Sequence, residues 1–193
     1  TIGILEQGSV VTISGLTNAA VPGGASYVTL ADIENNGAGF FSDGATQSTG
    51  AWSSGTLKLT VHAGKTVTSG TKYIFSFQVI NPSGAQNAAT VLIAASGTVS
   101  LASVTMTTDT PDLYGVAEGG KPMKVIVPSF SASLIGQSTP IADTTVTMSV
   151  TLTANIDFPT GSKVTIVGLT GTQTANNASL PVSSTSNRLG TAG

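Results

Sequence analysis

Apolar and polar residues alternate with a period of two along much of this chain. Within residues 144–153, Val146, Met148, Val150 and Leu152 fall on one face, and threonine or serine fills the positions between them. Only a β-strand places alternate residues on opposite faces, so this segment predicts a strand. Similar patterns predict further strands at Val10–Leu16, Ser26–Ala31, Thr56–Val61, Lys72–Ile80, Thr90–Ala95, Val99–Met106, Lys124–Phe130 and Lys163–Leu169.

The spacing of apolar residues predicts no helix. No segment keeps apolar residues at helical spacing for more than about one turn, and β-branched residues dominate the periodic stretches. Turn-forming sequences such as Pro22-Gly23-Gly24, Asn36-Gly37 and Asn81-Pro82-Ser83-Gly84 fall between the predicted strands. Many short strands with turns between them predict an all-β fold built as an antiparallel β-sandwich.

One stretch without alternation divides the predicted strands into two groups. Residues 107–122 are rich in turn-forming residues and lack an apolar face. We therefore expect a first immunoglobulin-like β-sandwich unit at 1–106, a linker at 107–122 and a second such unit at 123–193. The predicted fold class is all-β, with tandem immunoglobulin-like antiparallel β-sandwich units.

An internal repeat is the most informative feature of the sequence. Gly8–Thr17 reads GSVVTISGLT and Gly161–Thr170 reads GSKVTIVGLT, so eight of ten positions are identical. Agreement at this level indicates a duplication rather than the reuse of a common turn.

The two copies of the repeat stand at different places in their units. Two predicted strands, Lys124–Phe130 and residues 144–153, precede the second copy, whereas only seven residues precede the first. Nothing after the second copy matches the strands predicted at Thr56–Val61 and Lys72–Ile80. We therefore expect each unit to lack strands. An incomplete sheet exposes unpaired N–H and C=O groups over an apolar face, so we expect a neighbour to supply the missing strand.

Three segments carry a resemblance to known protein families, namely Leu57–Val61 (LKLTV), Tyr73–Pro82 (YIFSFQVINP) and Gly161–Leu169 (GSKVTIVGL). In these strands and glycine turns, the chain resembles the immunoglobulin-like repeats of large secreted cell-surface proteins. It is also similar to donor-strand-type pilin and fibre subunits, in which an N-terminal strand completes the sandwich of the preceding subunit. The resemblance implies a homo-oligomeric helical fibre. Unlike pilins, this chain has no cysteine and only a short candidate donor arm at Thr1–Leu5.

The composition of the chain limits the range of possible functions further. Charged residues make up 8% of the chain, against roughly 25% in ordinary soluble domains, and serine and threonine take their place. The seven lysines and arginines are scattered and the net charge is −2, so we expect no binding of nucleic acid. No apolar run is long enough for a membrane span. A hydroxyl-rich surface with few charges suits glycan cover or dense lateral packing, so we expect an extracellular or cell-surface location.

Residue types that carry catalysis or bind metals are scarce. His62 is the only histidine and cysteine is absent, which leaves a Ser-His-Asp triad or a zinc site without support. Asp109 with Asp112, or Asp32 with Glu34, could contribute to a calcium site at a domain junction, but no calcium-loop sequence is present and Asp109 fits the shaping of a turn better. No pair of carboxylates follows a glycosidase pattern. We therefore expect a protein that is not an enzyme and has no cofactor.

Two further features concern sugars. Trp52 and Tyr114 lie outside the strongest strands and would stack on a glycan if they were exposed, although packing at a sandwich edge is the favoured interpretation for Trp52. Asn177 begins the one N-glycosylation sequon, Asn177-Ala178-Ser179, since proline blocks Asn81-Pro82-Ser83.

Together these features favour a structural subunit of an extracellular filament or surface fibre, assembled by β-strand donation between copies of the chain. The alternative is an adhesin or carbohydrate-binding β-sandwich module displayed on a surface stalk, with glycans as its partners. We expect the assembly strands to contain the apolar residues Ile2, Ile4, Leu5, Val146, Met148, Val150 and Leu152.

Overall fold

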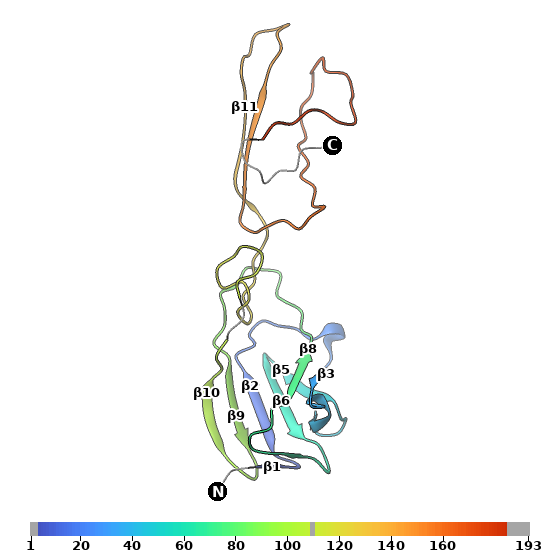
Figure 1. Cartoon of the computed structure of the whole chain (residues 1–193), viewed down its shortest axis with the longest axis vertical. Coiled ribbons are helices and arrows are strands. Elements are labelled where there is room, and N and C mark those ends of the chain that lie inside the picture. The colour runs from blue at the N-terminus through green and yellow to red at the C-terminus, as the bar shows by residue number, and fades with distance from the viewer. Residues whose placement is uncertain (1–3, 109–110, 185–193) are drawn as a thin grey trace. The chain divides into compact units, whose positions relative to one another are not determined.

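The computed structural model describes residues 4–108 and 111–184 and contains β-strands but no α-helix in these residues (Figure 1). The only helical turns there are two short 3₁₀ turns, η1 and η2. Contacts group the residues up to Phe158 in one compact unit and those from Pro159 in another. The elements are β1 (Leu5–Glu6), β2 (Val10–Ser14), η1 (Pro22–Gly24), β3 (Tyr27–Glu34), η2 (Ala38–Phe40), β4 (Phe41–Ser42), β5 (Thr49–Ser53), β6 (Thr56–Val61), β7 (Thr66–Val67), β8 (Ile74–Phe77), β9 (Leu92–Ser96), β10 (Leu101–Thr105), β11 (Phe130–Gln137) and β12 (Met148–Ala154).

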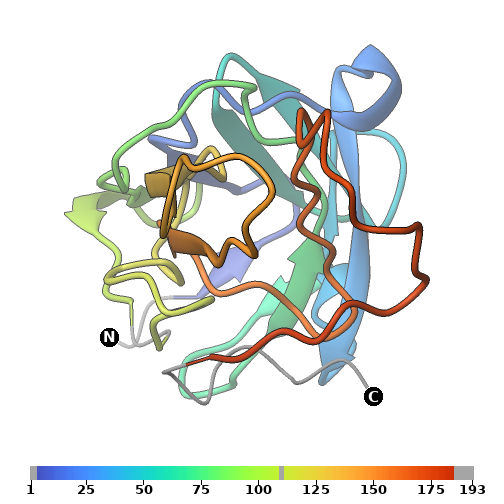
Figure 2. The ribbon, with the colours of Figure 1, turned by 90° about the horizontal axis from the view of Figure 1, so that it is seen from above.

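One antiparallel sheet contains most of the strands of the first unit. Its strand order is β10-β9-β2-β6-β5-β3-β8, and β4 pairs with β6 beside this path. Figure 1 shows β10, β9 and β2 on the left of this sheet and the other strands to their right, and Figure 2 shows that the sheet curves. Curvature of this kind follows from the twist of neighbouring strands. The chain is therefore all-β with antiparallel sheets, an arrangement compatible with a β-sandwich; that its units are immunoglobulin-like and in tandem stays a prediction.

The core of this sheet is centred on β6. Leu57, Leu59 and Val61 alternate with polar residues along this strand and are 0%, 1% and 1% exposed. Burial of each such side chain contributes about 1.5–3 kcal/mol, so this strand stabilises the unit strongly. Side chains from strands on both sides of β6 join the same cluster: Val28 and Leu30 of β3, Phe41 of β4, Trp52 of β5 and Ile13 of β2.

Most strands lie where the alternation predicts them, and two predicted strands do not form. The segment Thr56–Val61 forms β6 with the same bounds. In contrast, Lys124–Phe130 is irregular apart from a bridge between Gln86 and Val125 and its last residue, which begins β11. Lys163–Leu169 forms no strand. Both segments have the right alternation but lack a partner strand, and a strand needs a partner for its backbone groups.

Five strands of the structure were not predicted from the sequence: the two-residue strands β1, β4 and β7, and the longer strands β5 and β11. β5 contains Gly50, which interrupts the alternation; a Cβ there would lie 2.5 Å from Leu57 Cδ1, so close packing against β6 explains the glycine. β11 carries Leu134 and Ile135 side by side, a pair that gives no period-two pattern. Its partner β12 covers the last six residues of the strand predicted at 144–153 and ends one residue beyond it.

The described residues contain no helix with the length and apolar character needed to cross a bilayer. The division of the chain into two immunoglobulin-like units at 1–106 and 123–193, joined by a linker at 107–122, stays a prediction.

Candidate assembly surfaces

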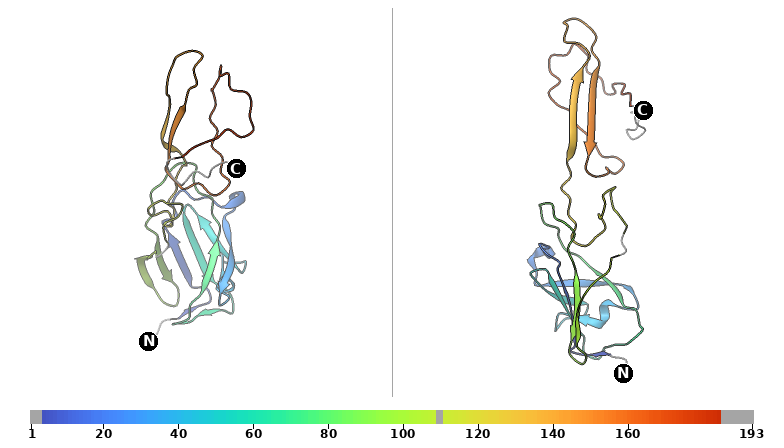
Figure 3. Two further views of the ribbon diagram at one scale, coloured as in Figure 1. Left: turned by 45° about the horizontal axis from the view of Figure 1, so that its top comes forward. Right: turned by 90° about the vertical axis from the view of Figure 1, so that its left-hand side faces the viewer.

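The hairpin of β11 and β12 exposes apolar side chains on one face. In this two-stranded sheet Ile135 lies opposite Val150, and Met148 and Leu152 occupy the same face two residues to either side. Ile135 is 52% exposed, and Met148 and Val150 are each 42% exposed. Figure 3 shows the two strands of this hairpin in its right-hand view. A two-stranded sheet is at best marginally stable in water by itself, so this face is suited to packing against another surface.

The predicted assembly residues fall into two groups in the structure. Met148, Val150 and Leu152 share one face of β12, whereas Val146, two residues before Met148, precedes the strand and is 40% exposed. The predicted alternation thus does produce a shared face over residues 148–152. That this face mediates assembly is a separate prediction.

The N-terminal candidates have a different environment. Ile2 lies outside the described residues. Ile4 is 37% exposed and precedes β1. Leu5 belongs to β1, pairs with Val67 of β7 and packs against the core. Leu5 therefore already has partners within its own chain, which makes β12 the better candidate for contact with a second molecule.

A second apolar surface, which sequence reasoning missed, lies on β2, β9 and β10. It is a shallow groove lined only by apolar side chains, among them Val11, Ile93, Leu101 and Val104. Leu101 and Val104 are 55% and 58% exposed. The pattern predicted all three strands, but it did not place these residues together, because the pairing of β9 with β10 shifts between Leu101 and Val104.

The second copy of the repeat keeps the local backbone of the first. Gly8 and Gly161 have φ angles of +83° and +88°, and Gly15 and Gly168 have φ angles of +92° and +87°. The same turn precedes each copy: Ser9 N–H donates to the Glu6 carbonyl at 3.0 Å, and Ser162 N–H donates to the Pro159 carbonyl at 3.1 Å.

The surroundings of the two copies differ. Gly8–Thr17 contains the central strand β2, whereas Gly161–Thr170 forms no strand and leaves its apolar side chains exposed. Val164, Ile166 and Leu169 are 42%, 47% and 51% exposed. This segment is a third apolar surface of the described residues.

The polar groups that were considered for chemistry serve local structure. His62 is half-buried and its backbone N–H donates to the Phe40 carbonyl at 2.9 Å. Asp32 Oδ1 accepts a hydrogen bond from the Ala38 N–H at 2.6 Å and so fixes the backbone at the first residue of η2. In the part of the chain that the structure describes, no three His, Cys, Asp or Glu side chains come together as metal ligands would. Asp109 lies outside the described residues.

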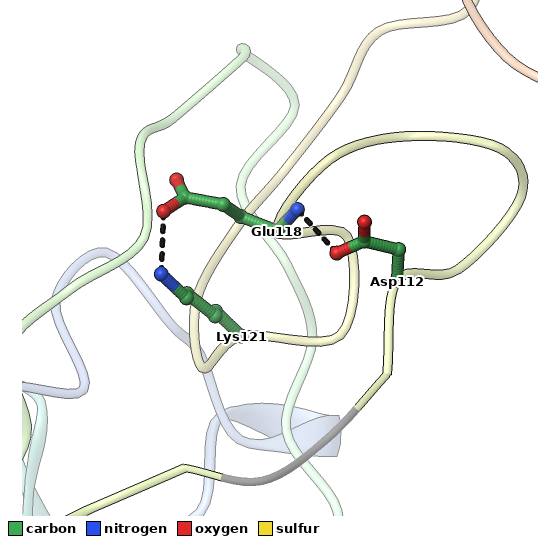
Figure 4. Close-up of polar contacts among 3 residues, drawn as sticks. All are labelled: Asp112, Glu118 and Lys121. Atoms are coloured by element: carbon green, nitrogen blue, oxygen red, sulfur yellow. Dashed lines mark hydrogen bonds and ion pairs between the residues drawn. The ribbon is translucent and has the colours of Figure 1, made fainter.

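One charged contact lies in the irregular segment before Pro122. Lys121 forms an ion pair and hydrogen bond with Glu118, whose N–H in turn donates to Asp112 Oδ1 at 2.7 Å (Figure 4). The hydrogen bond from Lys121 and its positive charge lower the pKa of Glu118. Both side chains of the ion pair are about half exposed, so the contact shapes a surface loop and contributes little to stability.

The residues considered for sugars also separate. Trp52, on the inner strand β5, is 9% exposed and belongs to the core rather than to a sandwich edge, whereas Tyr114 is 65% exposed. Asn177 is exposed, and its Oδ1 accepts a hydrogen bond from the Ser179 N–H at 3.0 Å, within the sequon itself. Glycosylation at Asn177 stays a prediction.

No protein-family model matches this chain, and neither a curated protein nor a solved structure matches it.

Proposed function

We propose that this chain is a structural subunit of an extracellular filament or surface fibre, in which strands of one copy complete the sheets of the next. The observation that carries the proposal is the hairpin of β11 and β12, whose apolar face leaves Ile135, Met148 and Val150 between 42% and 52% exposed. Its outer strand edges also offer backbone N–H and C=O groups for pairing with another chain.

The free energy that such a contact makes available is large. Full burial of an apolar side chain such as Val150 or Met148 contributes about 1.5–3 kcal/mol. Three or four of them would offset much of the cost of bringing two molecules together. Because the hairpin has a single charged residue, Asp143, in its connecting loop, few polar groups would have to lose their water.

Low charge also supports the proposed location and strength of the fibre. With 8% charged residues, contacts between copies would be apolar and hydroxyl-based rather than ionic, and salt would not screen them. A role of this kind needs neither a catalytic group nor a cofactor.

Electron microscopy of the purified chain tests the proposal. We expect filaments that persist at about 1 M NaCl, because apolar contacts are not screened by ions. We expect Val146→Asp to abolish them, since it places a charge in the apolar row of β12. Thr147→Asp adds the same charge on the opposite side and serves as the matched control. Filaments in Val146→Asp, or their loss in Thr147→Asp alone, would contradict assembly through this row.

The alternative function, an adhesin or carbohydrate-binding module, keeps one supporting observation. Tyr114 is 65% exposed and has an aromatic face that is free to stack on a sugar ring, whereas Trp52 is buried and offers none. Glycan-array binding that persists in Tyr114→Phe and disappears in Tyr114→Ala would separate the two functions, because fibre assembly through β12 does not depend on Tyr114.

A further inference from the structure

The groove on β2, β9 and β10 lies on the core-facing side of the sheet. Val11 and Ile93 both pack against the core cluster. Leu101 pairs with Ala95, and Val104 pairs with Ile93, so both residues of β10 project to the same side as their partners. The core-facing side of the sheet is therefore apolar as far as β10, but at β10 its side chains are exposed.

The groove and the hairpin face have matching chemistry. The groove is lined by apolar side chains only, and residues 92–96 and 101–105 contain no charged residue. The hairpin presents Ile135, Met148, Val150 and Leu152 on one face. Burying an unpaired charge costs much free energy, and neither surface carries a charge, so contact between them would not incur this cost.

The two surfaces also match in length. β12 has seven residues and β10 has five, and at about 3.3 Å per residue these strands extend about 23 Å and 17 Å. The alternating row of β12 can therefore lie along the whole of the groove.

The repeat identifies what should occupy the groove. Only residues 155–160 separate the hairpin from Gly161–Thr170, the segment equivalent to β2 and its flanking turns. In the second copy of the repeat, the β11–β12 hairpin thus comes directly before the segment equivalent to β2. In the first copy, β2 itself lines part of the groove through Val11, so a hairpin of this kind is the segment we expect beside it.

We propose that the apolar face of the β11–β12 hairpin of one molecule covers the β2–β9–β10 groove of a second copy of this chain. Each copy carries one hairpin and one groove, and these are different surfaces. The contact is therefore heterologous, and repeated head to tail it forms an open chain of subunits rather than a closed dimer. This inference rests on the proposed fibre function and names the two surfaces that would join.

A complementation experiment tests the proposal. Val104→Asp puts a charge in the groove and leaves the hairpin unchanged, whereas Val150→Asp does the reverse. Both side chains are largely exposed, at 58% and 42%, so the first sheet should keep its stability, which the fluorescence of Trp52 reports. Thr105→Asp and Ser149→Asp place the same charge on the opposite sides of β10 and β12 and are the matched controls.

In sedimentation velocity, we expect the wild type and both control variants to form assemblies that grow with concentration. Each groove or hairpin variant alone should associate at least about a hundredfold more weakly, because the charge would be buried unpaired. Mixed in equal amounts, the two should form a one-to-one dimer and nothing larger, since the mixture retains one intact groove and one intact hairpin that can pair.

The outcomes distinguish this inference from the broader function. A mixture that stays monomeric while the wild type forms filaments overturns the pairing of these two surfaces and leaves the fibre function standing. If either variant by itself still forms large assemblies, its mutated surface is not needed for assembly, and this outcome also overturns the inference. A wild-type chain that stays monomeric overturns both the inference and the fibre function. This holds also if the chain is monomeric because its hairpin packs on its own groove.

Discussion

The two copies of the ten-residue repeat share their local backbone but have opposite surroundings. In the first copy, β2 lies between β6 and β9, and Ile13 and Leu16 are 8% and 6% exposed. Their counterparts Ile166 and Leu169 are 47% and 51% exposed in a segment that forms no strand.

The side chains do not explain this difference. The copies differ only where Lys163 replaces Val10 and Val167 replaces Ser14, and every residue that β2 turns toward the core has an identical counterpart. The comparison teaches that a sequence with strong strand character becomes a strand only where neighbouring strands are present to accept its hydrogen bonds.

The largest effect should come from a charge at the equivalent isoleucines. Ile13→Asp would bury a carboxylate between Leu57 and Ile93, the pairing partners of Ile13. Loss of the buried side chain and burial of the charge should cost about 5 kcal/mol or more, which is comparable to the whole stability of a small domain.

Urea denaturation followed by the fluorescence of Trp52 measures this difference, because Trp52 is the only tryptophan and is buried in the first sheet. We expect Ile13→Asp to lose the cooperative transition. Ile166→Asp should change the free energy of unfolding by no more than about 0.5 kcal/mol, as is usual for exposed positions. Equal effects of the two substitutions would show that the second copy is part of the same cooperative core.

An intermediate effect should follow from alanine at the equivalent glycines. Both Gly15 and Gly168 have positive φ angles that strain any residue with a Cβ, by about 1–2 kcal/mol. At Gly15 the new Cβ would also lie 2.3 Å from the Thr90 carbonyl oxygen, whereas at Gly168 no atom lies within 4 Å.

Gly15→Ala should therefore lower the midpoint of thermal unfolding by roughly 10 °C or more, because the clash with Thr90 adds several degrees to the effect of the backbone strain. Gly168→Ala should leave the same transition unchanged when it is followed by near-ultraviolet circular dichroism of Trp52. A midpoint for Gly15→Ala that equals the wild type would contradict the close approach of β2 to Thr90.

The smallest effect should come from the equivalent serines. Ser9 is 2% exposed; its hydroxyl lies 3.1 Å from Thr98 Oγ1 and accepts a hydrogen bond from the Thr98 N–H at 3.2 Å. Ser9→Ala removes both contacts and should cost about 1 kcal/mol.

Ser162→Ala is the matched control and should cost nothing measurable in chemical denaturation, because Ser162 is exposed. A second variant, Ser9→Thr, keeps the hydroxyl and tests whether the hydrogen bonds or the packing space decide the cost. If Ser9→Ala and Ser162→Ala are equally harmless, the contact with Thr98 does not stabilise the first sheet.

Particular strands show how far the sequence could predict the fold and the candidate site. β6 was predicted with its bounds because Leu57, Leu59 and Val61 alternate without interruption over a fully buried face. β5 was missed because Gly50 is required by the close approach of β6, a contact between strands that no local pattern reveals. The row from Val146 to Leu152 was predicted, but the groove at Leu101 and Val104 was not, since it depends on an irregular pairing with β9.

What the sequence alone determined is local. The period of two set which side chains share a face, and the glycines of each repeat set the same left-handed turns in both copies, because backbone sterics act over a few residues.

Only the tertiary structure decided which copy became the central strand. The hydrogen bonds of a sheet join residues that are far apart in the chain: β2 pairs with β6 and β9, more than forty residues away. A segment such as Gly161–Thr170 carries the pattern of a strand, but its backbone groups stay outside a sheet until strands from elsewhere lie beside it.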